Sequence, residues 1–420
     1  MNNLVIICAI LLLVLLFLKV PVYIAVLSAS AVYFIGTPGM NLSIFAQKTI
    51  SGAEGLSLLA IPFFVCAGIF MNYTGVTKRI MNCCEVLTAR MPGGLAQVNI
   101  LLSTLMGGLS GSSLADAAMQ CKMLVPTMES KGYSKSFSTV ITAASGMVVP
   151  LIPPGVGLII YGCINNISIG KLFIAGIGPG IVLCVTLMIF THFLSKKRGY
   201  LPSRTTKIPV SEKIAAVRPA FLPLLLPIII IGGVRIGVFT ASEAGTVAIV
   251  YAVLLGLLYK ELTLKNVMQG CKETVTTTAS IMLIVAAATC FSWILTKEQI
   301  PQQFSQWMIS NIHNKYVFLI MVNIFLLIVG MFIEGNASMI VLAPLLHPVA
   351  MAYGIDDIHF AMVYIFNCTI GAFTPPMGTL MFVSCGITKC PTKDFIKEAV
   401  PFYILFAIDI IVLTYIPQLT

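Results

Sequence analysis

The sequence predicts an all-α polytopic membrane protein built from two inverted repeats of five crossings each, with re-entrant helical hairpins and broken helices. One observation behind this prediction is composition, because 58% of the 420 residues are apolar and only 10% are charged. A soluble domain carries roughly a quarter charged residues, so much of this surface has to face lipid. The other observations are an internal repeat and four apolar stretches that are interrupted near their middles. Together they exclude a secreted enzyme, a DNA-binding protein and a disordered scaffold.

Uninterrupted apolar stretches mark the expected crossings, because an α-helix needs about 20 apolar residues to span a bilayer. The N-terminal stretch has no basic region before it and no small-residue cleavage site after it, so we expect a first membrane helix and not a cleaved signal. The expected crossings are, in chain order, 3–18, 21–36, 56–73, 172–194, 219–234, 239–259, 276–295 and 397–417.

Four longer apolar stretches are broken by small, polar or proline residues. Non-helical backbone at membrane depth is tolerated only where protein or water satisfies its polar groups, so these stretches predict hairpins or broken helices inside the protein. The expected hairpins are 94–131 and 316–353, and the expected broken helices are 134–166 and 357–387. Two more polar segments, 76–91 and 297–314, predict amphipathic helices along the membrane interface, with plain loops as the alternative.

An internal repeat relates the two halves of the chain without gaps when the sequence is shifted by 222 residues. Gly108 then falls on Gly330, and Pro153-Pro154 falls on Pro375-Pro376. Prolines in register with glycines and with the interruptions indicate a genuine duplication. The expected organisation is a first repeat over 1–194, a basic linker over 195–218 and a second repeat over 219–420.

The charge distribution gives the expected orientation. Five crossings is an odd number, so the second repeat has to be inverted relative to the first. With the linker 195–218 in the cytoplasm, 19 of the 25 Lys and Arg residues lie on the cytoplasmic side and five lie on the opposite side. This asymmetry follows the positive-inside rule, and it explains the net charge of +10 without any nucleic acid as partner.

The interrupted stretches carry groups that suit the binding of ions. The hairpin tips are Ser110–Asp116 and Glu334–Ser338, and the breaks are Val149–Gly155 and Gly371–Gly378. Half-helices that end there present carbonyls that can coordinate sodium, and half-helices that start there present N–H groups that suit a carboxylate. The sequence therefore predicts two cation sites around one anion site. The alternative is that these Gly, Ser and Pro residues serve close helix packing and kinks.

Polar residues inside apolar segments are candidates for substrate binding or transport, because a charge is costly there. Three of them have structural alternatives: Asp116 as a holder of the tip through backbone N–H groups, Glu243 as an ion-pair partner, and Lys297 as a side chain that extends to the interface. Ser145 and Asn367 are in register across the repeat and are expected to line the broken helices. The complete set is Ser113, Asp116, Ser145, Glu243, Lys297, Glu334, Asn336 and Asn367.

No catalytic or metal-binding pattern accompanies these residues in the sequence. The four histidines show no ligand spacing, the twelve cysteines include no CxxC, and no Ser/His/Asp set, Walker loop or HExxH occurs. We therefore expect no enzymatic activity, and no cofactor apart from sodium as a coupling ion.

The motifs together resemble one known family over nearly the whole chain. GGLSGSSLADAAM, VVPLIPPGVG, FTASEAGTVA, EGNASMIVLAPLLHP and GAFTPPMGTLMFV are similar to the large membrane subunit of tripartite ATP-independent periplasmic (TRAP) transporters. The resemblance implies sodium-coupled uptake of an organic acid, such as a C4-dicarboxylate or sialic acid, by an elevator motion of a transport domain against a scaffold. It also implies a separate small four-helix membrane subunit, a periplasmic substrate-binding protein, and a bacterial inner membrane with both termini in the periplasm.

Motif by motif, the resemblance assigns sodium binding to the tips and breaks, and acidic positions of the family to Asp116, Glu243 and Glu334. The implied sodium positions are Ser110, Ser112, Val149, Ile152, Gly155, Gly330, Gly371, Thr374 and Met377. Two other functions remain open, a self-sufficient divalent-anion/sodium symporter of similar build and an intramembrane enzyme or channel. The symporter is expected to carry Ser-Asn-Thr at its tips, whereas these tips read Gly-Ser-Ser and Gly-Asn-Ala.

Overall fold

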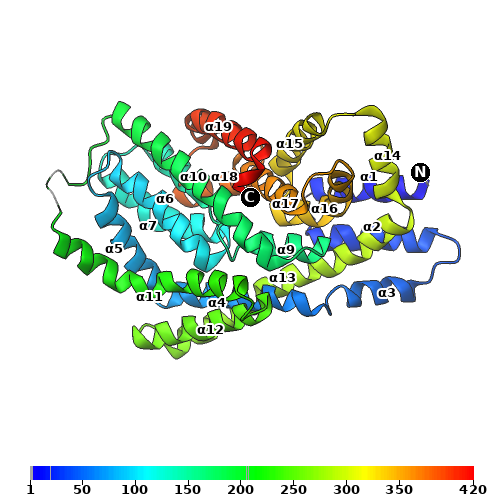
Figure 1. The fold of residues 1–420 in the computed structure, drawn as a ribbon, viewed down its shortest axis with the longest axis horizontal. Helices are drawn as coiled ribbons and strands as arrows, with labels where there is room; N and C mark the ends of the chain where they lie inside the picture. Colours follow the sequence, from blue (N-terminus) through cyan, green and yellow to red (C-terminus); the bar gives the residue numbers. More distant parts are fainter. Residues whose placement is uncertain (1–2, 19, 205, 207) are drawn as a thin grey trace.

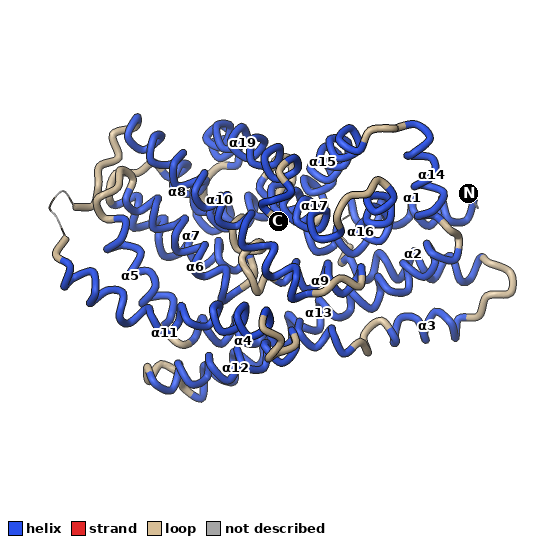
Figure 2. Tube along the Cα trace, viewed as in Figure 1, coloured by secondary structure: helices blue, strands red, loops and turns tan. Residues whose placement is uncertain are grey.

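The computed structural model describes residues 3–18, 20–204, 206 and 208–420, and within these ranges it contains helices and loops but no strand. Lys19 and Lys207, two of the basic residues expected on the cytoplasmic side, lie outside the described residues. Figure 1 shows an elongated bundle with the N-terminus at one end and the C-terminus near its middle. Figure 2 shows that loops join helices throughout. The prediction of an all-α protein is confirmed.

The described part of each half is a series of α-helices with one short 3₁₀ turn. The first half has α1 (Asn3–Phe17), α2 (Val22–Gly36), α3 (Leu42–Ser51), η1 (Leu56–Leu59), α4 (Ala60–Tyr73), α5 (Val76–Thr88), α6 (Gly94–Ser110), α7 (Ser113–Ser130), α8 (Lys135–Gly146), α9 (Val156–Asn165) and α10 (Ile169–Lys197). The second half has α11 (Val210–Arg235), α12 (Ala241–Leu258), α13 (Leu264–Lys297), α14 (Ile300–Asn311), α15 (Lys315–Phe332), α16 (Gly335–Ala352), α17 (Asp357–Phe373), α18 (Thr379–Thr388), α19 (Thr392–Tyr415) and η2 (Pro417–Leu419).

Helix boundaries in the two halves repeat at the offset of 222 residues that relates their sequences. Helices α7 and α16 both start and end in register, and α8 and α17 start in register at Lys135 and Asp357. Helices α9 and α18 differ from this register by a single residue at each end. The double prolines recur at matching positions, whereas the caps differ, with Ser112 and Ser134 in the first half matched by Glu334 and Asp356 in the second.

Several expected boundaries differ from the observed ones. The crossing expected over 56–73 begins as η1 and becomes α-helical only at Ala60. The crossing expected over 276–295 is the second part of α13, which starts at Leu264 because no proline interrupts the backbone hydrogen bonds before the apolar part. Segments 76–91 and 297–314 contain helices α5 and α14, so the alternative of plain loops is wrong. Helix α5 bends away from α4 by 70°.

Six helices of the described residues are long and apolar enough to cross a membrane unaided, or seven spans if the bent pair α4–α5 counts as one. These helices are α10, α11, α12, α13, α15 and α16. Helices α1 and α2 have 15 residues each, fewer than the roughly 20 that a straight span needs. Helices α15 and α16 are the arms of the second expected hairpin, and their length alone permits full crossings. The chain is a multi-pass membrane protein, and ten crossings remain a prediction.

The helices pack as two neighbouring groups, each with members from both halves. The outer group consists of α1–α5 and α11–α14, in which α4 packs on α12 and α13, and α13 packs on α2 and α3. Helix α5 also packs on α6, and α14 packs mainly on α16, so these two helices join the outer group to the core group. The core group consists of α6–α10 and α15–α19 and contains most of the buried aromatic side chains, such as Phe137, Phe173, Phe360 and Phe373. Figure 1 shows α3, α4 and α12 along one edge of the molecule and α15, α17 and α19 toward the opposite edge.

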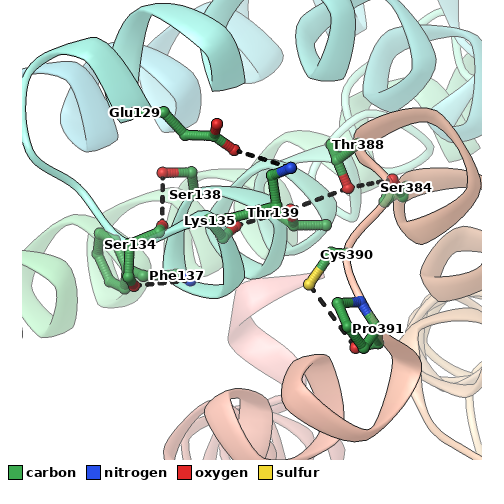
Figure 3. A network of polar contacts seen from close by, with 10 residues as sticks. All are labelled: Glu129, Ser134, Lys135, Phe137, Ser138, Thr139, Ser384, Thr388, Cys390 and Pro391. Carbon is green, nitrogen blue, oxygen red and sulfur yellow. Dashed lines mark hydrogen bonds and ion pairs between the residues drawn. The ribbon is translucent and has the colours of Figure 1, made fainter.

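Helices of the two halves pack against each other within the core group. Helix α7 of the first hairpin packs on α18 of the second broken helix, and α16 of the second hairpin packs on α9 of the first. Figure 3 shows a polar link at the contact of α8 and α18, where the Thr139 hydroxyl donates to the Thr388 hydroxyl over 3.1 Å. The Thr388 hydroxyl itself donates to the Ser384 carbonyl over 2.8 Å. Each hairpin therefore packs on the broken helices of both halves.

The basic linker expected over 195–218 is shorter in the structure. Helix α10 continues to Lys197 and α11 starts at Val210, because the residues at both ends are compatible with a helix. The described residues of the linker dock on the core group. The Tyr200 and Tyr133 rings stack with 4.4 Å between their centroids, and the Arg198 guanidinium forms an ion pair with Glu398 of α19.

Candidate functional site

The first hairpin tip places polar groups at the start of a long helix. Helix α6 ends at Ser110, Gly111 has a positive φ of 62°, and Ser112 caps α7 by accepting from the Ala115 N–H over 3.4 Å. Glycine is required at the turn, because a Cβ there would lie 2.7 Å from the carbonyl oxygen of Pro154. The turn thus brings the tip against the first break.

The second hairpin tip carries an acidic cap. Helix α15 ends at Phe332, and Glu334 caps α16. The Glu334 carboxylate accepts from the Ala337 N–H over 3.1 Å and from the Asn336 side-chain amide over 2.8 Å. A negative charge at the positive end of a helix is stabilising, so the carboxylate and the amide hold the tip together. Both residues are candidates that the sequence predicts.

Both broken helices are interrupted at their double prolines, as the sequence predicts. Helix α8 ends at Gly146 and α9 starts at Val156, while α17 ends at Phe373 and α18 starts at Thr379. The Pro153-Pro154 and Pro375-Pro376 peptide bonds are both cis. Because proline has no N–H to donate, carbonyls upstream of each pair lack their usual helical partners.

Carbonyl oxygens of the first break gather around the first tip. Within the described residues, the carbonyls of Val149 and Pro153 accept no backbone hydrogen bond, and a Cβ on Gly107 would lie 3.3 Å from the Val149 oxygen. The Ser110 hydroxyl is buried and has no hydrogen-bond partner in this part of the chain. The Val156 N–H donates to the Gly111 carbonyl over 3.4 Å and joins break to tip. Oxygen atoms of this kind are the ligands that hard cations prefer.

The backbone of the second broken helix lies directly against the backbone of the second hairpin. A Cβ on Gly330 would lie 2.8 Å from the Gly371 Cα, and a Cβ on Gly371 would lie 2.5 Å from the Gly330 Cα. The Thr374 N–H donates to the Gly371 carbonyl over 3.0 Å, and its hydroxyl donates to the Ile370 carbonyl over 2.7 Å. Met377 follows in the loop before α18. The implied sodium positions of this half therefore lie around one close contact of α15 and α17.

A cavity of about 590 Å³, here called the tip cavity, lies between the two hairpin tips and the outer group. Ile152, Gly155, Gly371 and Met377 do not line it and belong to the breaks behind it. Its polar lining consists of Ser110, Ser112, Ser113, Glu334 and Asn336 from the tips, Thr369 and Thr379 from the second broken helix, and Asn72, Thr276, Thr277 and Ser280 from α4 and α13.

Four helices begin at the tip cavity. Its lining includes the first residues of α7, α9, α16 and α18, which are Ser113, Val156, Gly335 and Thr379. Each helix N-terminus carries the equivalent of roughly half a positive charge, and at the start of α16 the Glu334 carboxylate already accepts from the Ala337 N–H. None of the described residues that line this cavity is Lys or Arg. The helix ends are therefore the main attraction that the cavity offers to a carboxylate.

The polar wall that the outer group contributes was not among the residues that the sequence suggests. Thr276, Thr277 and Ser280 lie on one stretch of α13, and Asn72 lies near the end of α4. The run TVTTTAS inside an apolar segment is the available signal. It carries no charge and has no matching run in the other half, so neither the cost of burial nor the repeat singles it out.

Asp116 does not line the tip cavity but lies buried among α6, α7 and α8. Its carboxylate accepts from the Ser103 hydroxyl over 2.7 Å and from the Gln120 amide over 2.8 Å. The Ser103 oxygen also lies 3.1 Å from the Ser145 oxygen. Asp116 and Ser145 therefore share one polar cluster behind the first tip. Side chains, and not the backbone N–H groups of the tip, are the donors that the structure gives Asp116.

Asn367 likewise lies away from the lining of the tip cavity. Its side-chain amide donates to the Asn323 oxygen over 2.8 Å and to the Val363 carbonyl over 2.7 Å. The Asn323 amide donates in turn to the Thr414 hydroxyl over 2.9 Å. The network joins α15, α17 and α19, so Ser145 and Asn367 belong to separate polar clusters of the two broken helices, and their role in transport stays a prediction.

Glu243 and Lys297 both lie outside the tip cavity. The Glu243 carboxylate forms a capping box at the start of α12, where it accepts from the Thr240 N–H over 2.8 Å and from the Thr240 hydroxyl over 2.9 Å. Glu243 forms no ion pair within the described residues, so its structural role here is that of a helix cap and not that of an ion-pair partner. The Lys297 amine lies 5.5 Å from the centroid of the Trp293 ring.

Comparison with known proteins gives matches over nearly the whole chain. Residues 9–419 match the family described as the tripartite ATP-independent periplasmic transporter, DctM component. The sialic acid TRAP transporter large permease protein of Vibrio cholerae is 39% identical over 407 residues, which are 97% of this chain and 95% of that protein. The C4-dicarboxylate TRAP transporter large permease protein of Pseudomonas aeruginosa is 36% identical over 376 residues, 89% of this chain and 88% of that protein.

A solved structure supports the fold. The YdaH transporter of Alcanivorax borkumensis superposes with a TM-score of 0.66 and 14% sequence identity, covering 95% of this chain and 97% of that one. At this identity the likeness concerns the arrangement of helices and not the substrate.

Proposed function

We propose that this chain imports an organic acid together with sodium. The premise is its family, because the chain belongs to the DctM components of tripartite ATP-independent periplasmic transporters. It is the large permease subunit of a secondary transporter, and no enzyme family is indicated. The relatives reported above are named for sialic acid and for C4-dicarboxylates, which have a carboxylate in common. We assign the same class of cargo, a small organic acid, to this chain.

The observation that carries the proposal is the convergence of four helix N-termini on the tip cavity. In a low-dielectric interior, the N–H groups at helix N-termini can hold a carboxylate without any basic side chain, and α7, α9 and α18 are the three of these helices that no acidic side chain caps. Hydroxyl and amide groups of α4 and α13 supply further hydrogen bonds on the opposite wall. Ser113, Asn336 and Thr379 are the side chains that we assign to the substrate.

Sodium coupling is proposed at the two places where a hairpin arm ends beside a break. The first site uses the Ser110 hydroxyl and carbonyls around Val149, and the second uses carbonyls around Gly330, Gly371 and Thr374. Bound sodium offsets the partial negative charge of the converging helix ends and keeps each tip folded against its break. When a tip is held against its break, the helix N-terminus at that tip is in place to bind the acid. Binding of sodium therefore favours binding of the acid, and this couples their transport.

We propose that the two halves are inverted repeats and that the core group moves as one elevator body against the outer group. Support comes from the crossing of the halves, which ties α7 to α18 and α16 to α9. The tip cavity, by contrast, lies between the core group and helices α4 and α13 of the outer group. A sliding motion at this boundary changes the side from which the cavity is reached and leaves the core packing intact.

The proposed partners follow from the family. A TRAP large permease works with a small membrane subunit and a substrate-binding protein, and we propose a four-helix subunit against the outer group and a periplasmic protein that delivers the acid. The proposed location is the bacterial inner membrane, with both termini and the ends of the α9–α10 and α11–α12 pairs on the periplasmic side. The basic linker then lies in the cytoplasm.

Uptake into proteoliposomes tests the proposal. The chain is reconstituted with its small subunit, and radiolabelled N-acetylneuraminate or succinate is added with the binding protein and an inward sodium gradient. We expect accumulation only when all three proteins and the gradient are present. Accumulation by this chain alone would favour a self-sufficient symporter, and accumulation without sodium would remove the coupling sites.

A further inference from the structure

A second and larger cavity of about 1300 Å³, here called the basic cavity, adjoins the tip cavity. Its lining comes from the end of α3 with η1, the α9–α10 turn, the α11–α12 turn and the last part of α13. These segments belong to the side of the molecule opposite the basic linker. The lining is rich in hydroxyl groups, which include Ser168, Thr240, Ser242, Thr289, Ser292 and Thr296.

The charged groups of the basic cavity are mainly positive. Lys171 of α10 and Arg235 of α11 line it, and Glu243 is the one acid among its described lining residues. The Glu243 carboxylate is already engaged by Thr240 in the capping box of α12. No ion pair neutralises Lys171 or Arg235 within the described residues. Two cations without an ion pair among the described residues therefore line a cavity whose one lining acid is already capped.

Two more basic side chains flank the same cavity. Trp293 lines it, and the amines of Lys48 and Lys297 lie 5.7 Å and 5.5 Å from the centroid of its ring. Of the five basic residues expected on this side, two therefore line the cavity and two more lie near its lining residue Trp293. The acids beside it are Glu54, next to the lining residue Gly55, and Glu298, which accepts from the Tyr33 hydroxyl.

The two cavities follow each other along the same helices. On α13, Thr276 to Ile281 line the tip cavity and Val285 to Thr296 line the basic cavity. On α9, Gly157 lines the first and Gly162 lines the second. With a rise of about 1.5 Å per residue, the step from Ile281 to Val285 is roughly 6 Å along the helix axis. The two cavities therefore lie along successive stretches of α9 and α13.

We propose that the basic cavity is a second anion-binding site, in which Lys171 and Arg235 hold the carboxylate of the organic acid before it reaches the tip cavity. The proposal rests on the proposed function only for the identity of its ligand. A cavity with low-dielectric walls and charges of one sign raises the local concentration of the opposite ion and speeds its capture. The unpaired guanidinium and ammonium groups exchange their ligand readily, which suits a temporary site better than a permanent one.

Trp293 provides a direct test that needs neither a partner nor transport. The chain has two tryptophans, so Trp307→Phe leaves Trp293 as the only one. In nanodiscs of zwitterionic lipid at low salt, we expect iodide, an anion, to quench Trp293 fluorescence strongly compared with neutral acrylamide. Lys171→Gln with Arg235→Gln should lower the iodide quenching constant at least about twofold and leave the acrylamide constant unchanged. Added succinate should compete with iodide in the parent protein only.

Matched variants separate charge from shape. Lys171→Arg with Arg235→Lys keeps both charges and should retain iodide quenching, and Lys315→Gln removes a basic residue that does not line the cavity. Unchanged iodide quenching in the double glutamine variant overturns the proposal. The proposal is also overturned if the double glutamine variant lowers iodide and acrylamide quenching equally and the charge-retaining variant does the same. A change in the shape of the cavity would then explain the result.

Transport measurements connect the site to the proposed function. In the reconstituted complex, the double glutamine variant should raise the substrate concentration for half-maximal uptake about threefold or more and leave the maximal rate near that of the parent. If neither the parent nor the variant transports any acid, the proposed function fails. The quenching result still decides whether anions bind in the basic cavity. A fall in the maximal rate, with no change in the half-maximal concentration, contradicts a capture site.

Discussion

At the scale of single residues, glycine sets how closely the half-helices approach. Gly330 and Gly371 bring α15 and α17 into backbone contact, since a Cβ on either one would meet the other within 2.8 Å. Backbone cannot move aside as a flexible side chain does, so no larger residue fits without separating the helices. The implied sodium positions of the second half lie at this contact.

Replacing Gly330 by alanine is therefore expected to lower both thermal stability and sodium-dependent uptake. Overpacking of this kind typically costs about 1–3 kcal/mol. The matched control is Gly386→Ala on α18, where nothing lies within 4 Å of the added Cβ. Melting of the purified protein, followed with and without sodium, tests the pair. Equal melting temperatures for the two variants would show that the contact is not tight in the protein.

Asp116 illustrates a different residue-scale effect, because its charge is held by neutral donors. Ser103→Ala removes the hydroxyl that donates to the Asp116 carboxylate over 2.7 Å and accepts from Gln120 over 2.7 Å. Leaving these buried groups without partners should cost about 1–3 kcal/mol and lower the melting temperature. Ser310→Ala, on the exposed face of α14, serves as the control. A stable Ser103→Ala protein would contradict the buried cluster.

At the scale of elements, several helices begin where a side chain supplies a missing acceptor, and the broken helices are interrupted where prolines lack the N–H donor. Thr240 and Glu243 form a reciprocal cap on α12, and Glu334 caps α16. The double prolines do the opposite and leave carbonyls of the breaks unpaired. The same local chemistry thus produces both firm helix starts and the polar gaps between half-helices.

Thr240→Ala should destabilise α12, because the hydroxyl accepts from the Glu243 N–H over 3.3 Å and the cap loses this bond. Loss of an N-cap costs about 0.5–2 kcal/mol. Thr246→Ala, farther along the same helix, keeps the cap and is expected to melt with the parent protein. A melting temperature for Thr240→Ala as high as that of Thr246→Ala would mean that the cap does not contribute.

The second break offers a comparison of backbone and side chain at one position. Thr374→Ala keeps the N–H that donates to the Gly371 carbonyl over 3.0 Å, whereas Thr374→Pro removes it. If only the carbonyl serves sodium, the alanine variant should retain uptake and the proline variant should lose its sodium dependence. Uptake is measured over a range of sodium concentrations. Normal sodium dependence in Thr374→Pro would remove the site from this break.

At the scale of the whole molecule, the interleaved halves make the core group one body, and the tip cavity lies on its boundary with the outer group. Apolar packing between α7 and α18 and between α16 and α9 has to be lost for the halves to separate, which is costly. The boundary with α4 and α13 is partly lined by hydroxyl groups and is hollow. Helices α5 and α14 nevertheless pack on α6 and α16 of the core group, so an elevator motion requires these two helices to move or bend with it.

Crosslinks distinguish these two surfaces. In a cysteine-free background, Thr139→Cys with Thr388→Cys joins α8 to α18 inside the core group, where the two hydroxyls lie 3.1 Å apart. Gly170→Cys with Val234→Cys joins α10 of the core group to α11 of the outer group, where a Cβ on Gly170 would lie 2.6 Å from Val234. Oxidation should spare uptake in the first pair and abolish it in the second. Undiminished uptake by the second pair would contradict an elevator.

Local patterns made much of the site predictable. Turns and caps depend on neighbouring residues, so the sequence predicts the tip residues Ser110, Ser112, Ser113, Glu334 and Asn336, and all five line the tip cavity. That they bind sodium or substrate stays a prediction. Asp116, Ser145 and Asn367 were placed on the correct helices, but the direction of a side chain depends on which helix packs beside it. The sequence does not point to Thr276, Thr277 and Ser280 of α13. These residues are uncharged, so their burial is not costly enough to single them out.

The sequence by itself determined the helical class, the repeat offset and the positions of the tips and breaks, since these depend on composition, proline, glycine and capping residues close together in the chain. Only the tertiary structure decided that each hairpin packs on the broken helix of the other half, that four helix starts meet at one cavity, and that four basic residues from distant segments surround a second. The physical reason is that packing joins residues hundreds of positions apart, and no local pattern encodes the partner that buries a given face.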